Sequence, residues 1–133
     1  MSEAHQLTDL QLAILRVLWE RGSASAAEIT EALRPERGLA QQTIATILTR
    51  LERRGAVRHE TRQRQYFYLP VVTEPEVRRS MLTDVTDLLF EGDVAALVTH
   101  LLSAREMSPG DLVRVKNLIA AHETKRGHSH DDA

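Results

Sequence analysis

Residues 57–70 have a residue pattern typical of β-strands, and helical patterns lie on both sides of them. Val57 opens this segment and the aromatic run 66–68 lies near its end, with a polar, arginine-rich stretch between them. Valine and aromatic residues favour strands, so the pattern predicts two short strands joined by a turn near residues 61–64. The turn lacks the Asn-Gly or Asp-Gly pair that would specify its type. A hairpin in an otherwise helical chain predicts a mostly α fold with a small β element.

Three helices are predicted before this hairpin. Capping boxes at Thr8–Gln11 and Ser25–Glu28 predict two helix starts, because the side chain at each end of such a motif bonds the backbone at the other end. Gly22 is expected to end the first helix, and Pro35 to end the second, because proline disfavours helical geometry in the residue before it. A third helix is expected at about residues 41–54. Its apolar residues recur at the spacing of one helix face: Ile44, Ile47, Leu48 and Leu51.

Positive charge is concentrated in residues 34–72. This segment holds eight arginines and three glutamates, a net charge of +5, whereas the whole chain has a formal net charge of -2. All of its basic residues are arginine, whose planar guanidinium suits two-point contacts with phosphate. A compact basic segment within an acidic chain indicates a surface that binds an anion.

Three helices followed by a basic hairpin predict a winged helix–turn–helix over residues 7–72, with the third helix placed in the major groove of DNA. Once its apolar residues are assigned to the core, that helix offers glutamine, threonine and alanine near its start and arginine near its end. Glutamine and threonine can contact base edges, and arginine suits phosphates. The residues predicted to contact DNA are Gln41, Gln42, Thr43, Ala45, Thr46, Thr49, Arg50, Arg53, Arg54, Arg62, Arg64 and Tyr66.

Each of these features also has a simpler interpretation. A polar helix face is often only solvated, arginines at a helix end stabilise the helix dipole, and a basic hairpin can be a solvated ribbon. Their occurrence together within about 30 residues favours DNA binding.

From residue 73 the pattern is helical again, with helices expected to begin after Thr73, Asp93 and Ser108. So short a segment cannot enclose a core of its own, whereas a second copy can cover its apolar faces. Residues 73–123 are therefore predicted to form a helical dimerisation domain, and residues 124–133 a disordered tail. The expected interface residues are Met81, Val85, Leu88, Leu97, Leu101, Leu112, Val115 and Leu118.

Composition excludes several classes of protein. The chain has no cysteine, which excludes disulfide scaffolds, thiolate metal sites and cysteine nucleophiles. It has neither a signal peptide nor an apolar run near the roughly 20 residues that cross a bilayer, so we expect a cytoplasmic protein without membrane insertion. No motif indicates an enzyme or a cofactor site. The tail carries His128, His130, Asp131 and Asp132, but a flexible tail gives ligands no fixed geometry, and we expect no metal site.

Several short motifs of this chain occur together in one family. They are Leu18-Trp19, Ala24-Ser25-Ala26, Thr43-Ile44, Thr46, Leu48-Thr49-Arg50-Leu51, Gly55 and the run from Tyr66 to Leu69. In these motifs, residues 7–72 resemble the DNA-binding domain of the BlaI/MecI/CopY family of bacterial repressors, and residues 73–123 match its dimerisation region in layout and length. The resemblance implies a homodimer that binds a palindromic operator in double-stranded DNA and represses transcription.

The resemblance also implies how the operator is released. In the β-lactam branch of the family, a membrane sensor-protease signals cleavage of the repressor within its dimerisation region. The matching bond here lies near His100-Leu101, where the cleaved relatives carry Asn-Phe. A membrane sensor-protease is thus an implied partner, and antibiotic-response genes are implied targets. The copper-sensing branch binds metal through C-terminal cysteines, and this chain has none.

Two other functions stay open at this stage. A metal- or ligand-sensing regulator with the same winged helix would show operator affinity that changes with its ligand. A winged helix that serves as a protein-interaction module would keep its activity when the turn arginines are mutated.

Overall fold

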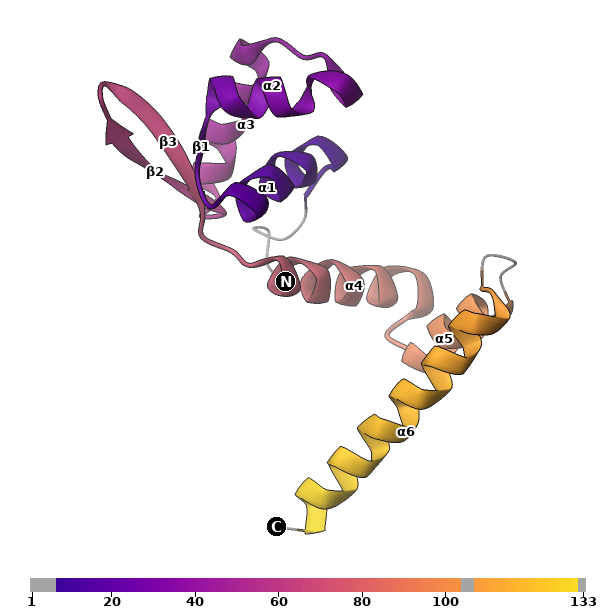
Figure 1. The fold of residues 1–133 in the computed structure, drawn as a ribbon. Helices are drawn as coiled ribbons and strands as arrows, with labels where there is room; N and C mark the ends of the chain where they lie inside the picture. The colour runs from indigo at the N-terminus through magenta and orange to yellow at the C-terminus, as the bar shows by residue number, and fades with distance from the viewer. Residues whose placement is uncertain (1–6, 104–106, 132–133) are drawn as a thin grey trace. The chain divides into compact units, whose positions relative to one another are not determined.

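The computed structural model describes residues 7–103 and 107–131, with side chains as far as Arg126. Figure 1 shows the chain in order. Its elements are α1 (Asp9–Arg21), β1 (Ala24–Ser25), α2 (Ala26–Arg37), α3 (Gln41–Arg53), β2 (Val57–Arg62), β3 (Gln65–Pro70), α4 (Glu74–Phe90), α5 (Val94–Ser103) and α6 (Pro109–Asp131). The predicted fold class, mostly α with a small β wing, is confirmed. The chain divides into two compact units, residues 1–85 and 86–133.

The first unit is built on one apolar core, to which α1, α2, α3 and the sheet all contribute. The helices contact each other through side chains that are fully removed from water, among them Leu18, Ile29 and Leu48. The hairpin adds Val57 and Tyr68 to the same core. The predicted apolar face of the third helix is confirmed for Ile44, Leu48 and Leu51, which are buried, while Ile47 is half-buried against the core.

Both predicted capping boxes form. At α1, the Thr8 N–H donates to Gln11 Oε1 at 2.9 Å and the Gln11 N–H donates to Thr8 Oγ1 at 3.2 Å. Ser25 and Glu28 make the same pair of bonds at the start of α2. Each box satisfies two backbone donors that the first helical turn leaves unpaired.

The prediction that α2 ends before Pro35 is wrong, because the helix includes this proline and continues to Arg37. Proline removes one N–H, but the carbonyl that would accept it belongs to Glu31, an exposed residue, so water can take its place. The last turn is held in two other ways. Arg37 donates to Asp9 of α1 at 2.7 Å, and Gly38, at a φ of 47°, donates its N–H to the Arg34 carbonyl.

The sheet has three antiparallel strands in the order β1-β3-β2. Its two-residue strand β1 was not predicted, because so short a strand has no periodicity and exists only through pairing with β3. The predicted hairpin is confirmed, and its turn consists of Gln63 and Arg64. Both have a positive φ, 50° and 65°, which is the backbone of a type I′ turn made without glycine or asparagine.

Helix α4 begins in the first unit. Val77 is buried in the core of that unit and Met81 packs partly against it. The boundary between the two compact units lies within α4, after Val85. The division into a DNA-binding domain to residue 72 and a dimerisation domain from residue 73 stays a prediction. The predicted place of Met81 in a dimer interface stays a prediction.

In the second unit, α5 and α6 expose their apolar side chains. No residue of α5 is buried, and within the described part of α6 only Val115 is even half-buried. Both helices begin with the predicted caps: Asp93 accepts from the Ala96 N–H at 3.0 Å, and Ser108 and Asp111 form a capping box. Helix α6 runs to Asp131, into the segment predicted to be disordered.

Across the described ranges, every helix is too short or too polar to span a bilayer.

Candidate nucleic-acid interface

Helix α3 presents one apolar face to the core and one polar face to solvent. On the polar face, Gln41, Gln42 and Thr43 of the first turn are exposed, and Ala45 is half-buried beside them. Residue 40 is an alanine and gives the helix no side-chain cap. The N–H of Thr43 donates to the Ala40 carbonyl at 3.1 Å, so those of Gln41 and Gln42 are the first-turn donors open to an acceptor such as a phosphate oxygen.

The two threonines farther along this face have a fixed orientation. The hydroxyl of Thr46 donates to the Gln42 carbonyl at 3.0 Å, and that of Thr49 donates to the Ala45 carbonyl at 3.1 Å. Each hydroxyl proton is therefore engaged within the helix. These two exposed side chains therefore offer a partner a methyl group and the lone pairs of the hydroxyl oxygen, which can only accept.

The arginines at the end of α3 divide into two kinds. The side chains of Arg50 and Arg53 are exposed and have no hydrogen-bond or ion-pair partner among the described residues. Arg54, in contrast, is half-buried, and its guanidinium donates to Gln11 Oε1 of α1 at 3.4 Å. Of the three arginines predicted to contact DNA here, Arg54 is thus engaged with the protein itself.

The wing, residues 57–70, has two chemically different faces, because side chains alternate along a strand. Arg58, Glu60 and Arg62 share one face of β2, and Phe67 of β3 is paired opposite Glu60. We call this the arginine face. Glu60 accepts from Arg62 at 2.7 Å and from Arg58 at 3.4 Å. The hydrogen bond from Arg62, reinforced by the charge of both guanidinium groups, lowers the pKa of the Glu60 carboxyl.

Arg62 and Arg64, the two wing arginines predicted to contact DNA, have different surroundings. The guanidinium of Arg62 is paired with Glu60 and lies 5.2 Å from the centre of the Phe67 ring. Arg64 lies in the turn, is exposed, and has no side-chain partner within the described part of the chain.

The opposite face of the wing, formed by His59, Tyr66 and Tyr68, is its aromatic face. The ring of His59 stacks on that of Tyr66, with centroids 4.0 Å apart and planes inclined by 15°. Nδ1 of His59 lies 2.7 Å and 2.8 Å from the two carboxylate oxygens of Glu52, near the end of α3. Tyr66 was a predicted site residue, whereas His59 and Glu52 were not. No local motif marks a pair that meets only when the wing folds back onto the helix.

Most of the apolar residues predicted for dimerisation are open to solvent in the single chain. Five are exposed to between 38% and 81%: Val85, Leu88, Leu101, Leu112 and Leu118. Leu97 and Val115 are half-buried.

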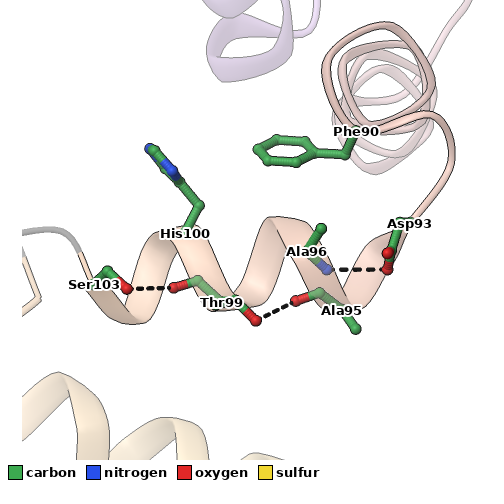
Figure 2. A pocket seen from close by; sticks show the side chains of 7 residues that line it. All are labelled: Phe90, Asp93, Ala95, Ala96, Thr99, His100 and Ser103. Atoms are coloured by element: carbon green, nitrogen blue, oxygen red, sulfur yellow. Dashed lines mark hydrogen bonds between the residues drawn. The ribbon is translucent and has the colours of Figure 1, made fainter.

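The predicted cleavage bond, His100-Leu101, lies inside α5. Both residues are exposed. Figure 2 shows His100 and Phe90 on either side of a shallow hollow, with ring centroids 6.0 Å apart, that Asp93, Ala96 and Thr99 also line.

Among the residues that the structure describes, no three His, Cys, Asp or Glu side chains come together as a metal site would require. The predicted absence of a site in the tail concerns side chains beyond Arg126, which lie outside the described part.

The sequence profile of the penicillinase repressor family matches residues 7–121. The chain belongs to this family. The penicillinase repressor of Bacillus licheniformis is 21% identical over 126 residues, which cover 95% of this chain and 98% of that protein. The methicillin resistance regulatory protein MecI of Mammaliicoccus sciuri is 19% identical over 118 residues, covering 89% of this chain and 96% of the relative.

A solved structure agrees with the family assignment. The DNA-binding domain of the repressor BlaI, determined in solution, superposes with a TM-score of 0.50 at 29% identity, covering 57% of this chain and 93% of that domain. The resemblance inferred from the motifs is confirmed, as is the winged helix–turn–helix fold.

Proposed function

We propose that this chain is a dimeric transcriptional repressor that binds a palindromic operator in double-stranded DNA. One observation carries the proposal: in a member of the penicillinase repressor family, the exposed polar face of α3 continues into Arg50 and Arg53, which have no side-chain partner among the described residues, and a basic wing follows in the chain. A helix fits the major groove, and guanidinium groups next to it can bind the flanking phosphates. The relative with a solved DNA-binding domain supports the same interpretation.

In this proposal, the side chains divide into those that read bases and those that hold the backbone. Gln42, Thr43 and Thr46 lie on the exposed face of α3 and are short or polar enough to contact base edges. Arg50 and Arg53 reach phosphates from the far end of the helix, and the wing arginines add a second anchor.

The test uses a duplex selected from a random pool and a scrambled duplex of the same composition, with affinities measured by fluorescence anisotropy at several salt concentrations. Arg50→Ala is expected to weaken both duplexes by the same factor and to reduce the salt slope by about one unit. Gln42→Ala is expected to weaken the selected duplex alone, by about 1–3 kcal/mol.

Arg16→Ala provides the control, since Arg16 is an exposed arginine on α1 rather than on α3 or the wing. It is expected to leave both affinities unchanged. Wild-type protein that binds no duplex would contradict the proposal. If Gln42→Ala weakened binding to both duplexes by the same factor, the residues that recognise bases would have to lie elsewhere than at Gln42.

Dimerisation is proposed because α5 and the described part of α6 bury none of their side chains within one chain. Helices of this length with exposed leucines are marginal in water unless a partner covers them. Two copies related by a twofold axis would cover these faces and present two copies of α3 to two half-sites, as a palindromic operator requires.

For release of the operator, we favour cleavage near His100-Leu101, signalled by a membrane sensor-protease in response to a β-lactam. Cutting within α5 would separate the winged helix from most of the proposed interface. A single winged helix binds one half-site and loses the gain from linked binding, on the order of 10²–10⁴ in affinity. Because the bond lies in a helix, α5 must open locally before it can be cut.

The mass of the protein in cells exposed to a β-lactam tests this mechanism. Fragments ending near residue 100 are expected as the repressed gene is switched on. A full-length protein that leaves its operator during induction would contradict cleavage and favour a ligand-sensing regulator.

A further inference from the structure

The carboxylate of Glu52 is the one negative charge of α3, and it lies in the last turn between Arg50 and Arg53. A free carboxylate there would repel the phosphates that its neighbours are proposed to bind. Instead, both of its oxygens lie within 2.8 Å of Nδ1 of His59 on the wing. The N–H at Nδ1 donates to the carboxylate whether the ring is neutral or charged, provided that its proton is on this nitrogen.

The His59 ring is held on a second side by Tyr66. Their rings are nearly parallel at 4.0 Å, and Tyr68 lies 5.9 Å from the same ring in a tilted orientation. One edge of His59 thus contacts α3 and one face contacts β3. A side chain held at an edge and a face has little freedom to change rotamer, so it can transmit the position of the helix to the wing.

This contact adds a side-chain link from the wing to α3 to the strand pairing that also holds the hairpin, in which Ala24 pairs with Tyr68 and Ser25 with Phe67. Toward the base of the hairpin, Val57 and Tyr68 are buried in the core. Toward its tip, residues 61–66 are all exposed. A two-residue turn closes the tip, so the position of the tip follows from the orientation of the strands where β1 holds β3 and where His59 contacts α3.

We propose that His59 is a positioning residue for DNA binding, which with Glu52 and Tyr66 holds the wing at a fixed position relative to α3. The proposal rests on the DNA-binding function proposed above. A wing held in this way lets Arg64 at its tip and Arg50 on the helix contact the same duplex together, whereas a mobile wing would lower the affinity. Pre-organised contacts bind more tightly because less conformational freedom is lost on binding.

Two variants separate the parts of the contact. His59→Phe keeps a ring on Tyr66 but removes the donor to Glu52, and His59→Asn keeps a donor close to the position of Nδ1 but removes the ring. The first readout is DNA affinity with and without Arg64→Ala. In wild-type protein, Arg64→Ala is expected to weaken binding about tenfold, as loss of a phosphate contact does at low salt.

When the protein already carries His59→Phe, adding Arg64→Ala is expected to weaken DNA binding less than about twofold, because the tip is no longer held where Arg64 can contact the DNA. His59→Asn is expected to restore part of the tenfold effect. Arg50→Ala, the matched control on α3, should cost the same factor in all backgrounds. If Arg64→Ala costs the same factor with and without His59, the proposal is overturned.

The second readout needs no DNA. The chain has no cysteine, so spin labels can be placed at Glu20→Cys on α1 and Gln63→Cys at the wing tip without further changes. Labelled chains are diluted with unlabelled protein so that only distances within one chain are measured. A narrow distance distribution is expected in wild-type protein, and a broader one in His59→Phe.

The two readouts distinguish the two proposals. A distribution as narrow in His59→Phe as in wild-type protein would overturn the positioning role even if DNA binds. If the distance distribution broadens in His59→Phe but the wild-type protein binds no duplex, the proposed function is overturned. The role of His59 in DNA binding is then overturned with it.

Discussion

At the scale of single residues, the orientation of Thr46 decides what α3 offers to a base. Its hydroxyl proton is used within the helix, so the exposed methyl group is the part free to contact a thymine methyl. Thr46→Ser removes this methyl, and we expect a loss of about 1 kcal/mol at one thymine of the selected duplex. Thr46→Val keeps the methyl and should bind nearly as wild type.

Replacing thymines of the duplex by uracils, one at a time, checks this prediction. Wild-type protein should bind more weakly when one particular thymine is replaced by uracil, whereas the Thr46→Ser protein should bind equally well with thymine or uracil there. If Thr46 instead contacts the base through its hydroxyl, Thr46→Val should weaken binding more than Thr46→Ser does.

Glu60 is the residue that restrains the arginine face of the wing. It pairs with both Arg58 and Arg62, so these cations must leave a carboxylate before they bind phosphate. Glu60→Gln should therefore raise affinity for selected and scrambled duplexes alike, and steepen the salt dependence. Glu31→Gln, which breaks an exposed ion pair with Arg34 on α2, is the matched control and should change neither. Unchanged affinity in Glu60→Gln would mean that these arginines do not contact DNA.

The same ion pairs make a small pH-dependent contribution to stability. Because the two arginines lower the pKa of Glu60, the contribution is present above the ordinary glutamate pKa and is lost as the pH falls through the lower folded-state value. Thermal unfolding of Glu60→Gln should thus approach that of wild-type protein as the solution becomes acidic.

At the scale of elements, the residues of the wing turn lower the stability of the hairpin but place a positive charge at its tip. Gln63 and Arg64 both adopt a left-handed backbone, which costs a residue other than glycine or asparagine about 1 kcal/mol. Replacing them together by Asn and Gly should raise the melting temperature while weakening DNA binding, because the charge of Arg64 is lost. Gln63→Asn alone should stabilise the protein and keep its affinity. Lower stability in the double variant would contradict this view of the turn.

At the scale of the whole molecule, the exposed leucines of α5 and α6 predict a dimer. Leu101→Asp places a charge in the proposed interface, and we expect it to produce monomers at micromolar concentration in sedimentation experiments. Its affinity should fall for the full operator but not for an isolated half-site, because only the tethering gain is lost. Val71→Asp is the control, since Val71 is 52% exposed and lies in the first unit. A wild-type protein that sediments as a monomer would contradict the prediction.

Local interactions in the sequence determined most of the elements. A capping box spans three residues and a helix face repeats every three or four, so Thr8–Gln11, Ser25–Glu28 and the apolar residues of α3 predict their own structure. The basic hairpin was readable for the same reason. The polar face of α3 was then predicted as the residues that remain after its apolar residues are assigned to the core.

Contacts between residues far apart in the chain were decided only by the tertiary structure. Strand β1 exists because β3 pairs with it, and the last turn of α2, beyond Pro35, includes a contact of Arg37 with Asp9 across 28 positions of sequence. Arg54 turns to Gln11, and His59 reaches Glu52, because folding brings different elements together. The energies of such contacts depend on distances that no local spacing encodes, which is why the sequence predicted the two DNA-contacting elements but not the side chains that connect them.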